Sequence, residues 1–392
     1  MSAPTKRVSS HSKQLQATVA ALAIGVLLAF VILEAGLRIF QPFPMRMRGD
    51  QILLPRNVTY KIHNTSPKDF AGVLDENLIH TKNSLGFRGP EPPATFGNAL
   101  TIVTVGGSTT ECFFLADGDD WPARLAAHLS VHFHELWLNN AGLDGHSTFG
   151  HLQLMRQYIS DLHPKFVTIL AGINDMFADG PNRYDKAPIE SAVSDLARYS
   201  DVAALALSLW RHEKALEIRD LGAMPRPINL HDSIYHTLKA APGQSGAIAP
   251  KEVSHIDAYR GRLMELVNLA RSSGIEPILI TQPALFGPAI DDITGINLAD
   301  ITVELDSALV GAQAWAALEA YNDAMREVGS KMSVSVVDLA RLMPKSSRYY
   351  YDFFHFTKAG AVKVASILDR QICPIVANKA PQYMIEGAQC SD

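Results

Sequence analysis

The sequence of 392 residues is poor in cysteine and has no strong excess of charge of either sign. Three cysteines are too few for the disulfide framework of a small secreted domain. Lysine and arginine (35) nearly balance aspartate and glutamate (40), and the basic residues are not clustered, so we expect no nucleic-acid partner. With 47% hydrophobic residues and no repeats or low-complexity segments, the composition is that of a folded protein.

Long apolar runs are also rare, and the one clear example lies near the N-terminus. Residues 17–33 (ATVAALAIGVLLAFVIL) carry no charge, and with the residues to Phe40 they can cross a hydrocarbon core of about 30 Å as a helix. A cleavable signal peptide would show small residues after the run, whereas this run leads into Glu34 and Arg38. A buried core helix is the alternative. We predict an uncleaved signal anchor over residues 15–40, which makes the lipid bilayer a partner.

The orientation of this anchor depends on the charges on its two sides. A cytoplasmic N-terminal tail over residues 1–14 is favoured by three basic residues, Lys6, Arg7 and Lys13. Three basic residues on the other side oppose this orientation, Arg38, Arg46 and Arg48. Because a large body follows without a second apolar span, we predict a single-pass membrane protein whose body is extracytoplasmic, in the periplasm or at the cell surface.

From about residue 100, short apolar segments alternate with longer amphipathic segments. The apolar segments predict strands at 100–106, 135–142, 165–172, 276–283 and 334–339. The amphipathic segments predict helices at 121–130, 150–162, 255–274, 315–330 and 357–372. Short apolar strands separated by helices predict a parallel sheet covered on both faces. The expected fold class is therefore α/β, a three-layer α/β/α sandwich around a five-stranded parallel sheet.

The alternation also sets the expected domain boundaries. Residues 41–99, rich in proline, asparagine and other polar residues, predict a stalk and lead-in segment with little regular structure. The α/β domain is expected to span residues 100–375, followed by a C-terminal tail over residues 376–392. Two stretches within the domain, about 176–250 and 284–312, do not continue the alternation, and we interpret them as insertions.

Polar residues follow the predicted strands directly, and in an open parallel sheet ligands bind beyond the carboxyl ends of the strands. Ser108 follows the first strand after two glycines, Gly142 follows the second, and Asn174 follows the third. Asp352 and His355 lie beyond the fifth strand. A serine hydroxyl needs a base, and a carboxylate three residues before a histidine can hold the other ring N–H. Ser108, His355 and Asp352 are therefore the candidate nucleophile, base and orienting carboxylate.

The tetrahedral intermediate of such a reaction needs hydrogen-bond donors for its oxyanion. The backbone N–H groups of Ser108 and Gly142 and the side-chain amide of Asn174 would supply three donors. Gly142 has no Cβ and so permits a close approach of the backbone. The same residues also have structural interpretations, as a helix-capping serine, a strand-terminating glycine and a turn asparagine.

Other chemistries fit these motifs less well. A phosphate-binding loop at residues 106–110 is disfavoured because no Gly-Lys-Ser/Thr follows the glycines. A metal site at Asp352 and His355 lacks a third ligand in a recognisable pattern. Cys112 is a conceivable thiol nucleophile, but a free cysteine is more often a buried hydrophobic residue. We expect neither a metal nor an organic cofactor.

Four short motifs occur in sequence order at these strand ends: GGST around Ser108, NAGLDG around Gly142, GIND around Asn174 and DFFH ending at His355. Together they resemble the four blocks of the SGNH (GDSL-like) hydrolases. The segment NSLGFRGPE (83–91) is similar to a lead-in found in membrane-anchored bacterial members. The first block reads Gly-Gly-Ser where the family name comes from Gly-Asp-Ser, a difference that leaves the nucleophile in place.

This resemblance covers about residues 83–372 and implies a flavodoxin-like sandwich that carries a serine ester hydrolase. It implies that Ser108 is both nucleophile and first oxyanion donor. By the same resemblance Gly142 and Asn174 are the further donors, while Asp352 orients the base, His355.

We therefore predict a membrane-anchored serine esterase that hydrolyses O-acyl esters, among them O-acetyl esters, of cell-surface glycans or lipids through an acyl-enzyme on Ser108. One alternative is an O-acyltransferase that passes the same acyl group to a sugar hydroxyl. Another is a non-catalytic glycan-binding or assembly protein on the same fold. In an oxidising compartment Cys373 and Cys390 are close enough in sequence to pair, which would leave Cys112 free.

Overall fold

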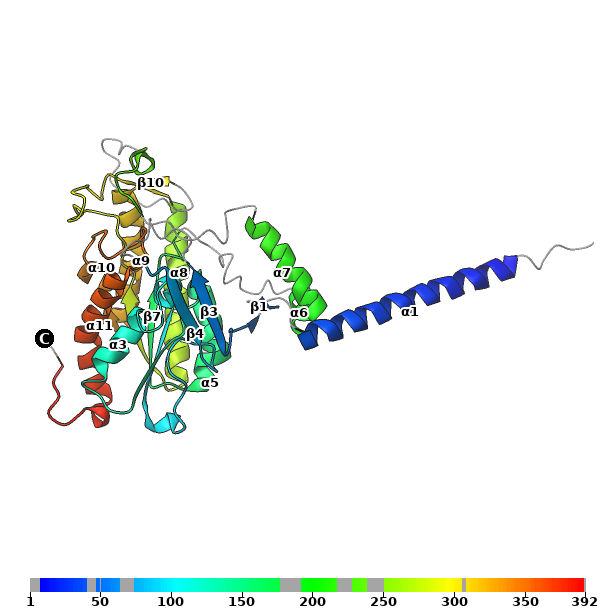
Figure 1. The fold of residues 1–392 in the computed structure, drawn as a ribbon, viewed down its shortest axis with the longest axis horizontal. Coiled ribbons are helices and arrows are strands. Elements are labelled where there is room, and N and C mark those ends of the chain that lie inside the picture. Colours follow the sequence, from blue (N-terminus) through cyan, green and yellow to red (C-terminus); the bar gives the residue numbers. More distant parts are fainter. Residues whose placement is uncertain are drawn as a thin grey trace, which may run out of the picture. The chain divides into compact units, whose positions relative to one another are not determined.

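A computed structural model describes most of the chain (Figure 1), namely residues 8–40, 47–49, 51–63, 74–176, 192–216, 228–237, 250–304 and 308–390. The chain divides into two compact units. The first unit combines Met1–Leu53 with Pro188–Leu221, and the second combines Leu54–Ala187 with Gly222–Asp392. Parts of the predicted N-terminal tail, lead-in segment, insertions and C-terminal tail lie outside the described residues.

The second unit is built on a five-stranded parallel sheet with the strand order β11-β8-β7-β5-β6. Its strands are β5 (Leu100–Gly106), β6 (Leu136–Asn140), β7 (Phe166–Ala171), β8 (Glu276–Thr281) and β11 (Ser335–Val337). Every residue of β5 and of β7 is buried, as expected for strands that are covered on both faces. The predicted parallel sheet is confirmed.

The direction in which strands are added reverses at β5. From β5 the chain passes to β6 on one side, returns to β7 on the other side, and continues outward through β8 to β11. Because crossovers between parallel strands are right-handed, this reversal places helices on both faces of the sheet. In open parallel sheets ligands bind beyond the carboxyl ends of the strands at such a reversal, which here are β5 and β7.

Helices form the two outer layers. One layer contains α3 and α11, which pack together (Figure 1), and the other contains α8, which contacts α4 and α9. Asp120 accepts a hydrogen bond from the N–H of Ala123 and so caps the start of α3. The bounds of the helices are α2 Ser108–Glu111, α3 Trp121–Leu129, α4 Thr148–Leu154, α5 Ser160–Leu162, α8 Pro250–Ser272, α9 Gly311–Met332, α10 Leu339–Leu342 and α11 Lys358–Lys379. A π-helical turn, Met155–Ile159, joins α4 to α5. The three-layer prediction is confirmed.

The lead-in segment has more regular structure than its sequence predicted. Strands β3 (Val58–His63) and β4 (Asn77–Lys82) form an antiparallel pair, and β1 (Met47–Arg48) pairs with β2 (Gln51–Ile52). The alternation in β4 is hidden because its buried side chains include His80 and Lys82 beside Leu78. The expectation of little regular structure over residues 41–99 is therefore wrong.

The C-terminal helix also differs from its predicted bounds, because α11 continues to Lys379 rather than ending at 372. The following residues return to the body of the second unit, where the N–H of His134 donates to the carbonyl of Tyr383 at 2.9 Å. Cys373 and Cys390 form a disulfide, and Cys112 is free and buried. Residues 376–390 are thus an attached extension of the domain.

The predicted insertions contain short elements of their own. In the second unit these are a 3-10 turn, Ser233–His236, and an antiparallel pair of β9 (Thr302–Glu304) and β10 (Ala308–Val310). In the first unit they are α6 (Ala192–Tyr199) and α7 (Asp201–Leu216). The insertion of residues 176–250 therefore belongs partly to each unit.

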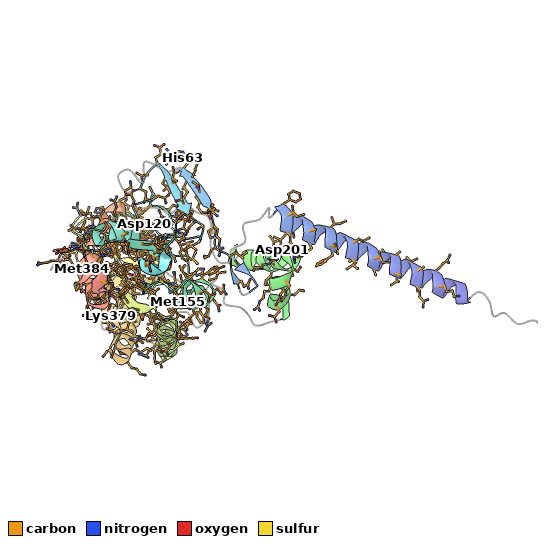
Figure 2. The ribbon with its side chains drawn as sticks, turned by 90° about the horizontal axis from the view of Figure 1, so that it is seen from below. His63, Asp120, Met155, Asp201, Lys379 and Met384 are labelled. Carbon is orange, nitrogen blue, oxygen red and sulfur yellow. A yellow bond between two sulfur atoms is a disulfide. The ribbon has the colours of Figure 1, made fainter. Side chains whose placement is uncertain are left out.

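The first unit contains α1 (Val8–Phe40), which Figure 2 shows with its side chains. Its large apolar side chains are exposed from Leu15 to Leu33 and again at Ile39 and Phe40. The stretch Lys13–Phe40, 28 residues, is long and apolar enough to cross a membrane, a test that a signal sequence also passes.

Near its C-terminal end, α1 contacts the N-terminus of α7. The Glu34 carboxylate accepts hydrogen bonds from the N–H groups of Asp201 (2.9 Å) and Val202 (3.1 Å) and from the Ser200 hydroxyl (2.9 Å). Arg38 donates to the same carboxylate at 2.8 Å. Because the first N–H groups of a helix have no partner within it, Glu34 caps α7 from outside.

Candidate active site

Ser108 lies in a tight turn at the carboxyl end of β5. The strand ends at Gly106, Gly107 precedes the helix, and Ser108 is the first residue of α2. The N–H groups of Thr110 (3.0 Å) and Glu111 (2.9 Å) both donate to the carbonyl of Gly107. A Cβ at Gly106 would lie 2.1 Å from Thr110 Oγ1, so the turn requires glycine there. The N–H of Ser108 occupies the first helical position, where it has no partner within the helix.

The structure brings Ser108, His355 and Asp352 together. His355 Nε2 lies 2.7 Å from Ser108 Oγ, and His355 Nδ1 lies 2.6 Å from Asp352 Oδ2. Asp352 Oδ1 accepts the N–H groups of Phe354 (2.9 Å) and His355 (2.7 Å), so its own loop holds the carboxylate in place. In this arrangement the imidazole can take the hydroxyl proton while the carboxylate stabilises the imidazolium that results.

Aromatic side chains surround the imidazole of His355. The ring of Tyr351 lies parallel to it, with an interplanar angle of 9° and centroids 5.5 Å apart, and the ring of Phe354 lies at 4.5 Å. The N–H of Tyr351 donates to the carbonyl of His355 at 3.0 Å. Ser108 and His355 line a small pocket with five neighbours, Cys112, Phe114, Leu115, Tyr351 and Phe356.

The charges of His355 and Asp352 are coupled. Burial lowers the pKa of His355, but the carboxylates of Asp352 and Asp144 raise it by more, so the pKa lies above its usual value. Burial raises the pKa of Asp352, but the imidazole and the two backbone N–H groups lower it by more, so this pKa lies below its usual value. The pair therefore favours an imidazolium beside a carboxylate, the state that follows removal of a proton from Ser108.

Asn174 follows β7, and its amide lies against the turn that carries Ser108. Asn174 Nδ2 donates to the carbonyl of His146 at 3.0 Å. A Cβ at Gly107 would lie 2.5 Å from Asn174 Nδ2 and 2.9 Å from that carbonyl oxygen, so glycine leaves the space that the amide occupies. An amide has two N–H donors, and the bond to His146 orients the group while leaving a second donor for a ligand.

Gly142, the third predicted oxyanion donor, has a hydrogen-bond partner for its N–H in its own turn. Its N–H donates to Asn140 Oδ1 at 2.9 Å, so this donor is engaged within its own turn. A Cβ at Gly142 would lie 2.4 Å from the backbone nitrogen of Glu111. Glycine is thus needed for a close approach, as predicted, but the group approached is the backbone of α2. The structure thus shows a packing role for Gly142, while its donor role stays a prediction.

Asp175, beside Asn174, connects the turn after β7 to the start of α4, at the carboxyl end of the sheet. Its carboxylate accepts the N–H of Thr148 at 3.1 Å and pairs with Arg262 Nη2 at 3.2 Å. Asp175 and Arg262 are both buried, and the Arg262 guanidinium lies 4.0 Å from the centroid of the Phe149 ring. The end of β7 is therefore held to the start of α4.

Cys112 does not have the properties of a nucleophile. It is buried, and burial together with the nearby Asp120 carboxylate raises the pKa of its thiol to about 12. Only a thiolate is strongly nucleophilic, so the thiol is inert near neutral pH.

A comparison with known protein families accounts for this arrangement. The model of the GDSL-like lipase/acylhydrolase family matches residues 104–362, which is more than half of the chain. The chain belongs to this family. The match begins within β5 and ends within α11, so it includes Ser108, Asn174, Asp352 and His355. The resemblance seen in the sequence is confirmed, and the acylhydrolase is a serine ester hydrolase.

Solved structures similar to this acylhydrolase include an α/β hydrolase from the metagenome of Lake Arreo, Spain, with 18% identity, coverage of 72% of this chain and 95% of that chain, and a TM-score of 0.39. An acetylxylan esterase from Geobacillus stearothermophilus is 16% identical, with 69% and 93% coverage and a TM-score of 0.39. A GDSL-like lipase from Bacteroides thetaiotaomicron is 14% identical, with 74% and 92% coverage and a TM-score of 0.37. No curated protein sequence matches significantly.

Sequence reasoning missed several buried charged residues near the site of the acylhydrolase, Lys82, Arg88, Glu111 and Arg262. Glu111 could have been found from its position three residues after Ser108, which places it in the same short helix. Arg88 lies within the segment NSLGFRGPE and Lys82 directly precedes it, but the sequence analysis assigned no role to either residue. Arg262 lies far from all of the motifs. Within the described part of the acylhydrolase, no group of three or more His, Cys, Asp or Glu side chains is arranged to hold a metal ion.

Proposed function

We propose that this acylhydrolase is a membrane-anchored enzyme that hydrolyses O-acyl esters through an acyl-enzyme on Ser108. The observation that carries the proposal is the pair of contacts made by one imidazole, from His355 Nε2 to Ser108 Oγ at 2.7 Å and from His355 Nδ1 to Asp352 Oδ2 at 2.6 Å. These distances allow proton transfer without rearrangement of the side chains.

In the first half of the reaction, Ser108 Oγ attacks the carbonyl carbon of the ester while His355 Nε2 takes the hydroxyl proton. The tetrahedral intermediate collapses, the bond to the alcohol oxygen breaks, and the leaving alcohol receives the proton from His355. The raised pKa of His355 helps it to hold this proton while the intermediate exists.

In the second half, a water molecule attacks the acyl-enzyme while His355 takes its proton. The bond to Ser108 Oγ then breaks, the proton returns to that oxygen, and the carboxylic acid leaves. Two donors are proposed for the oxyanion in both halves, the N–H of Ser108 and the second N–H of Asn174 Nδ2.

The proposed membrane anchor is α1. The stretch from Lys13 to Leu33 is about 30 Å long at about 1.5 Å per residue, which matches the hydrocarbon core of a bilayer. Glu34 follows this stretch, and its carboxylate is bonded to donors at the start of α7, so the charge need not enter hydrocarbon. The disulfide between Cys373 and Cys390 supports a catalytic unit outside the cytoplasm, because such bonds persist in oxidising compartments.

The proposed substrates are O-acyl esters of glycans or lipids at the surface of the same membrane. Anchoring an enzyme raises its effective concentration toward substrates that share its surface. Four of the residues that line the pocket beside Ser108 and His355 are aromatic or aliphatic, namely Phe114, Leu115, Tyr351 and Phe356, and we propose that they contact the acyl group, with acetyl as the first candidate.

The test of the proposed function is reaction of the full chain, in detergent, with a fluorophosphonate probe, followed by mapping of the modified residue by mass spectrometry. We expect modification of Ser108, no reaction of the Ser108→Ala variant, and the same melting temperature for both proteins. Release of acetate from an acetylated glycan should fall by at least about 10⁴-fold in Ser108→Ala. Modification of another residue, or undiminished acetate release by Ser108→Ala, would refute the assignment.

Hydrolysis and transfer are separated by the products. With an acetylated donor and an unacetylated oligosaccharide acceptor, we expect free acetate as the main product. Quantitative recovery of the acetyl group on the acceptor would replace hydrolysis by transfer, with the same acyl-enzyme.

A further inference from the structure

We propose that Glu111 and Lys82 are positioning residues for the ester hydrolysis, and that strand β4 of the lead-in segment is therefore part of the catalytic unit. Glu111 would hold the loop of residues 142–146 against α2, and Lys82 would supply the counter-charge. This inference rests on the proposed function, because it concerns the donors that face Ser108.

Glu111 is a buried carboxylate in the same short helix as Ser108. It is only 6% exposed, and its Oε2 accepts the N–H of Asp144 from the loop after β6. The backbone of this loop also touches α2 directly, since a Cβ at Gly142 would lie 2.4 Å from the nitrogen of Glu111. The Glu111 carboxylate therefore fixes the distance between the turn that carries Ser108 and the loop.

Lys82 is the cation that neutralises this carboxylate. It is 3% exposed at the end of β4, and its Nζ lies 2.8 Å from Glu111 Oε1. His80 lies 4.0 Å from the same oxygen, but burial and the cations of Arg88 and Lys82 lower its pKa to about 3, so it is neutral near pH 7. A buried carboxylate without a counter-charge is costly, so Glu111 depends on Lys82.

The loop held by Glu111 leads to the predicted oxyanion donor. Asp144 is bonded to Glu111, Gly145 follows with a φ of +74°, and His146 then presents the carbonyl that accepts Asn174 Nδ2 at 3.0 Å. A displacement of Asp144 would therefore move the acceptor that orients the Asn174 amide. Catalytic groups must be held within a fraction of an ångström, so a small displacement would slow the reaction.

A second contact from the lead-in segment supports the same part of α2. Arg88 is 2% exposed, and its guanidinium donates to the carbonyls of Glu111 (2.8 Å), Cys112 (2.9 Å) and Leu115 (3.0 Å). These three carbonyls lie at and just after the end of the helix. Two cations of the lead-in segment, Lys82 and Arg88, thus contact the helix that begins with Ser108.

The decisive experiment compares two double variants of the full chain in detergent, Lys82→Met with Glu111→Gln and Lys82→Met with Glu111→Met. Neither leaves an unpaired buried charge, and they differ in whether residue 111 can accept the Asp144 N–H. With p-nitrophenyl acetate, we expect the Gln variant to keep kcat within about 3-fold of the parent. We expect the Met variant to lose kcat by about 10–100-fold, with KM little changed and the pH at half-maximal rate unchanged.

The single variant Lys82→Met, which leaves Glu111 without its counter-charge, should be slower than the Gln double variant. The control Lys379→Met breaks the ion pair with Glu276, 3.0 Å apart at the amino-terminal end of β8, and should keep the parent kcat. Equal kcat values for the two double variants, with differences only in melting temperature, would overturn the positioning role. Failure of the parent to react with the fluorophosphonate would instead refute the proposed function.

Discussion

Ser108 faces two groups of residues that the chain assembles in different ways. On one side, His355 and Asp352 come from one short loop, and the Asp352 carboxylate is bonded only three residues away, to the ring and backbone of His355. On the other side, Asn174 and His146 come from two different strand ends, and their contact spans 28 residues. The proton-transfer side is therefore stabilised locally, and the oxyanion side depends on contacts between distant segments.

The two sides also use buried carboxylates differently. Asp352 is paired with the imidazole that we propose as the base, and its charge raises the pKa of that imidazole. Glu111 and Asp175 instead accept backbone N–H groups of neighbouring loops and are paired with Lys82 and Arg262. Substitutions on the two sides should consequently have different signatures: changes in pH dependence on the first side, and changes in kcat at unchanged pH dependence on the second.

The largest effect among these tests is expected for Asp352→Asn. The amide cannot stabilise the imidazolium and favours the wrong tautomer, so kcat should fall by about 10³–10⁴-fold. Loss of the negative charge should also lower the pKa of His355 and move the acid limb of the residual activity to lower pH. Steady-state rates between pH 4 and 9 check both effects. An acid limb that stays in place would contradict the coupling of the two groups.

Asn174→Ala should have the next largest effect. Loss of one oxyanion donor should lower kcat by about 10²–10³-fold. Since the substitution does not touch His355 or Asp352, the acid limb should stay at the pH found for the parent. Full activity of this variant would remove Asn174 from the mechanism, and a shifted limb would mean that the two sides are not separable.

The pH dependence of the parent should show a single acid limb. Only the neutral imidazole can accept the Ser108 proton, so kcat/KM should fall about 10-fold per pH unit below the pKa of His355 and level off above it. Because Asp352 raises this pKa, the limb should lie above the usual histidine value of about 6.5. Because the pKa of His355 is higher in the folded protein than in the unfolded chain, protonation of His355 stabilises the folded protein. This contribution to the free energy of unfolding is complete below the unfolded-state pKa of His355, and it should be lost as pH rises through the folded-state pKa. A limb below about pH 6 would contradict the direction of the shift.

The smallest effect is expected for Cys112→Ala. The thiol is buried and protonated, so kcat should stay within about 3-fold of the parent and labelling of Ser108 should be retained. Stability should fall through the lost packing, by about 1 kcal/mol as measured by chemical denaturation. Loss of labelling in this variant would reopen the thiol as a reactive group.

The first unit provides a contrast, because its internal contacts were not predicted. Glu34 was interpreted only as a sign that the apolar run ends, and the structure shows it bonded to the backbone of Asp201 and Val202. Those residues lie in a segment interpreted as an insertion, and no pattern in their local sequence predicts a contact with Glu34. The partner of an ionised side chain is set by the path of the chain, which local patterns do not describe.

The outcome at each predicted residue follows the same division. The strands, their parallel arrangement and the meeting of Ser108, Asp352 and His355 followed from apolar periodicity and from the position of each motif at a strand end. The donor role of Gly142 stays a prediction, and the structure adds that Asn140, two residues earlier, accepts its N–H, a contact that the sequence did not indicate. Lys82 was hidden in a segment whose buried strand face is polar.

Local chemistry thus predicted the fold class and the candidate reactive residues, because burial of strands and the reactivity of hydroxyl and imidazole groups are properties of short segments. The tertiary structure decided which backbone N–H groups are already engaged and which charges are buried beside Ser108. Hydrogen bonds and ion pairs depend on distances of a few ångströms between segments far apart in the chain. Lys82 and Glu111 become partners only when β4 and α2 are packed in the same unit.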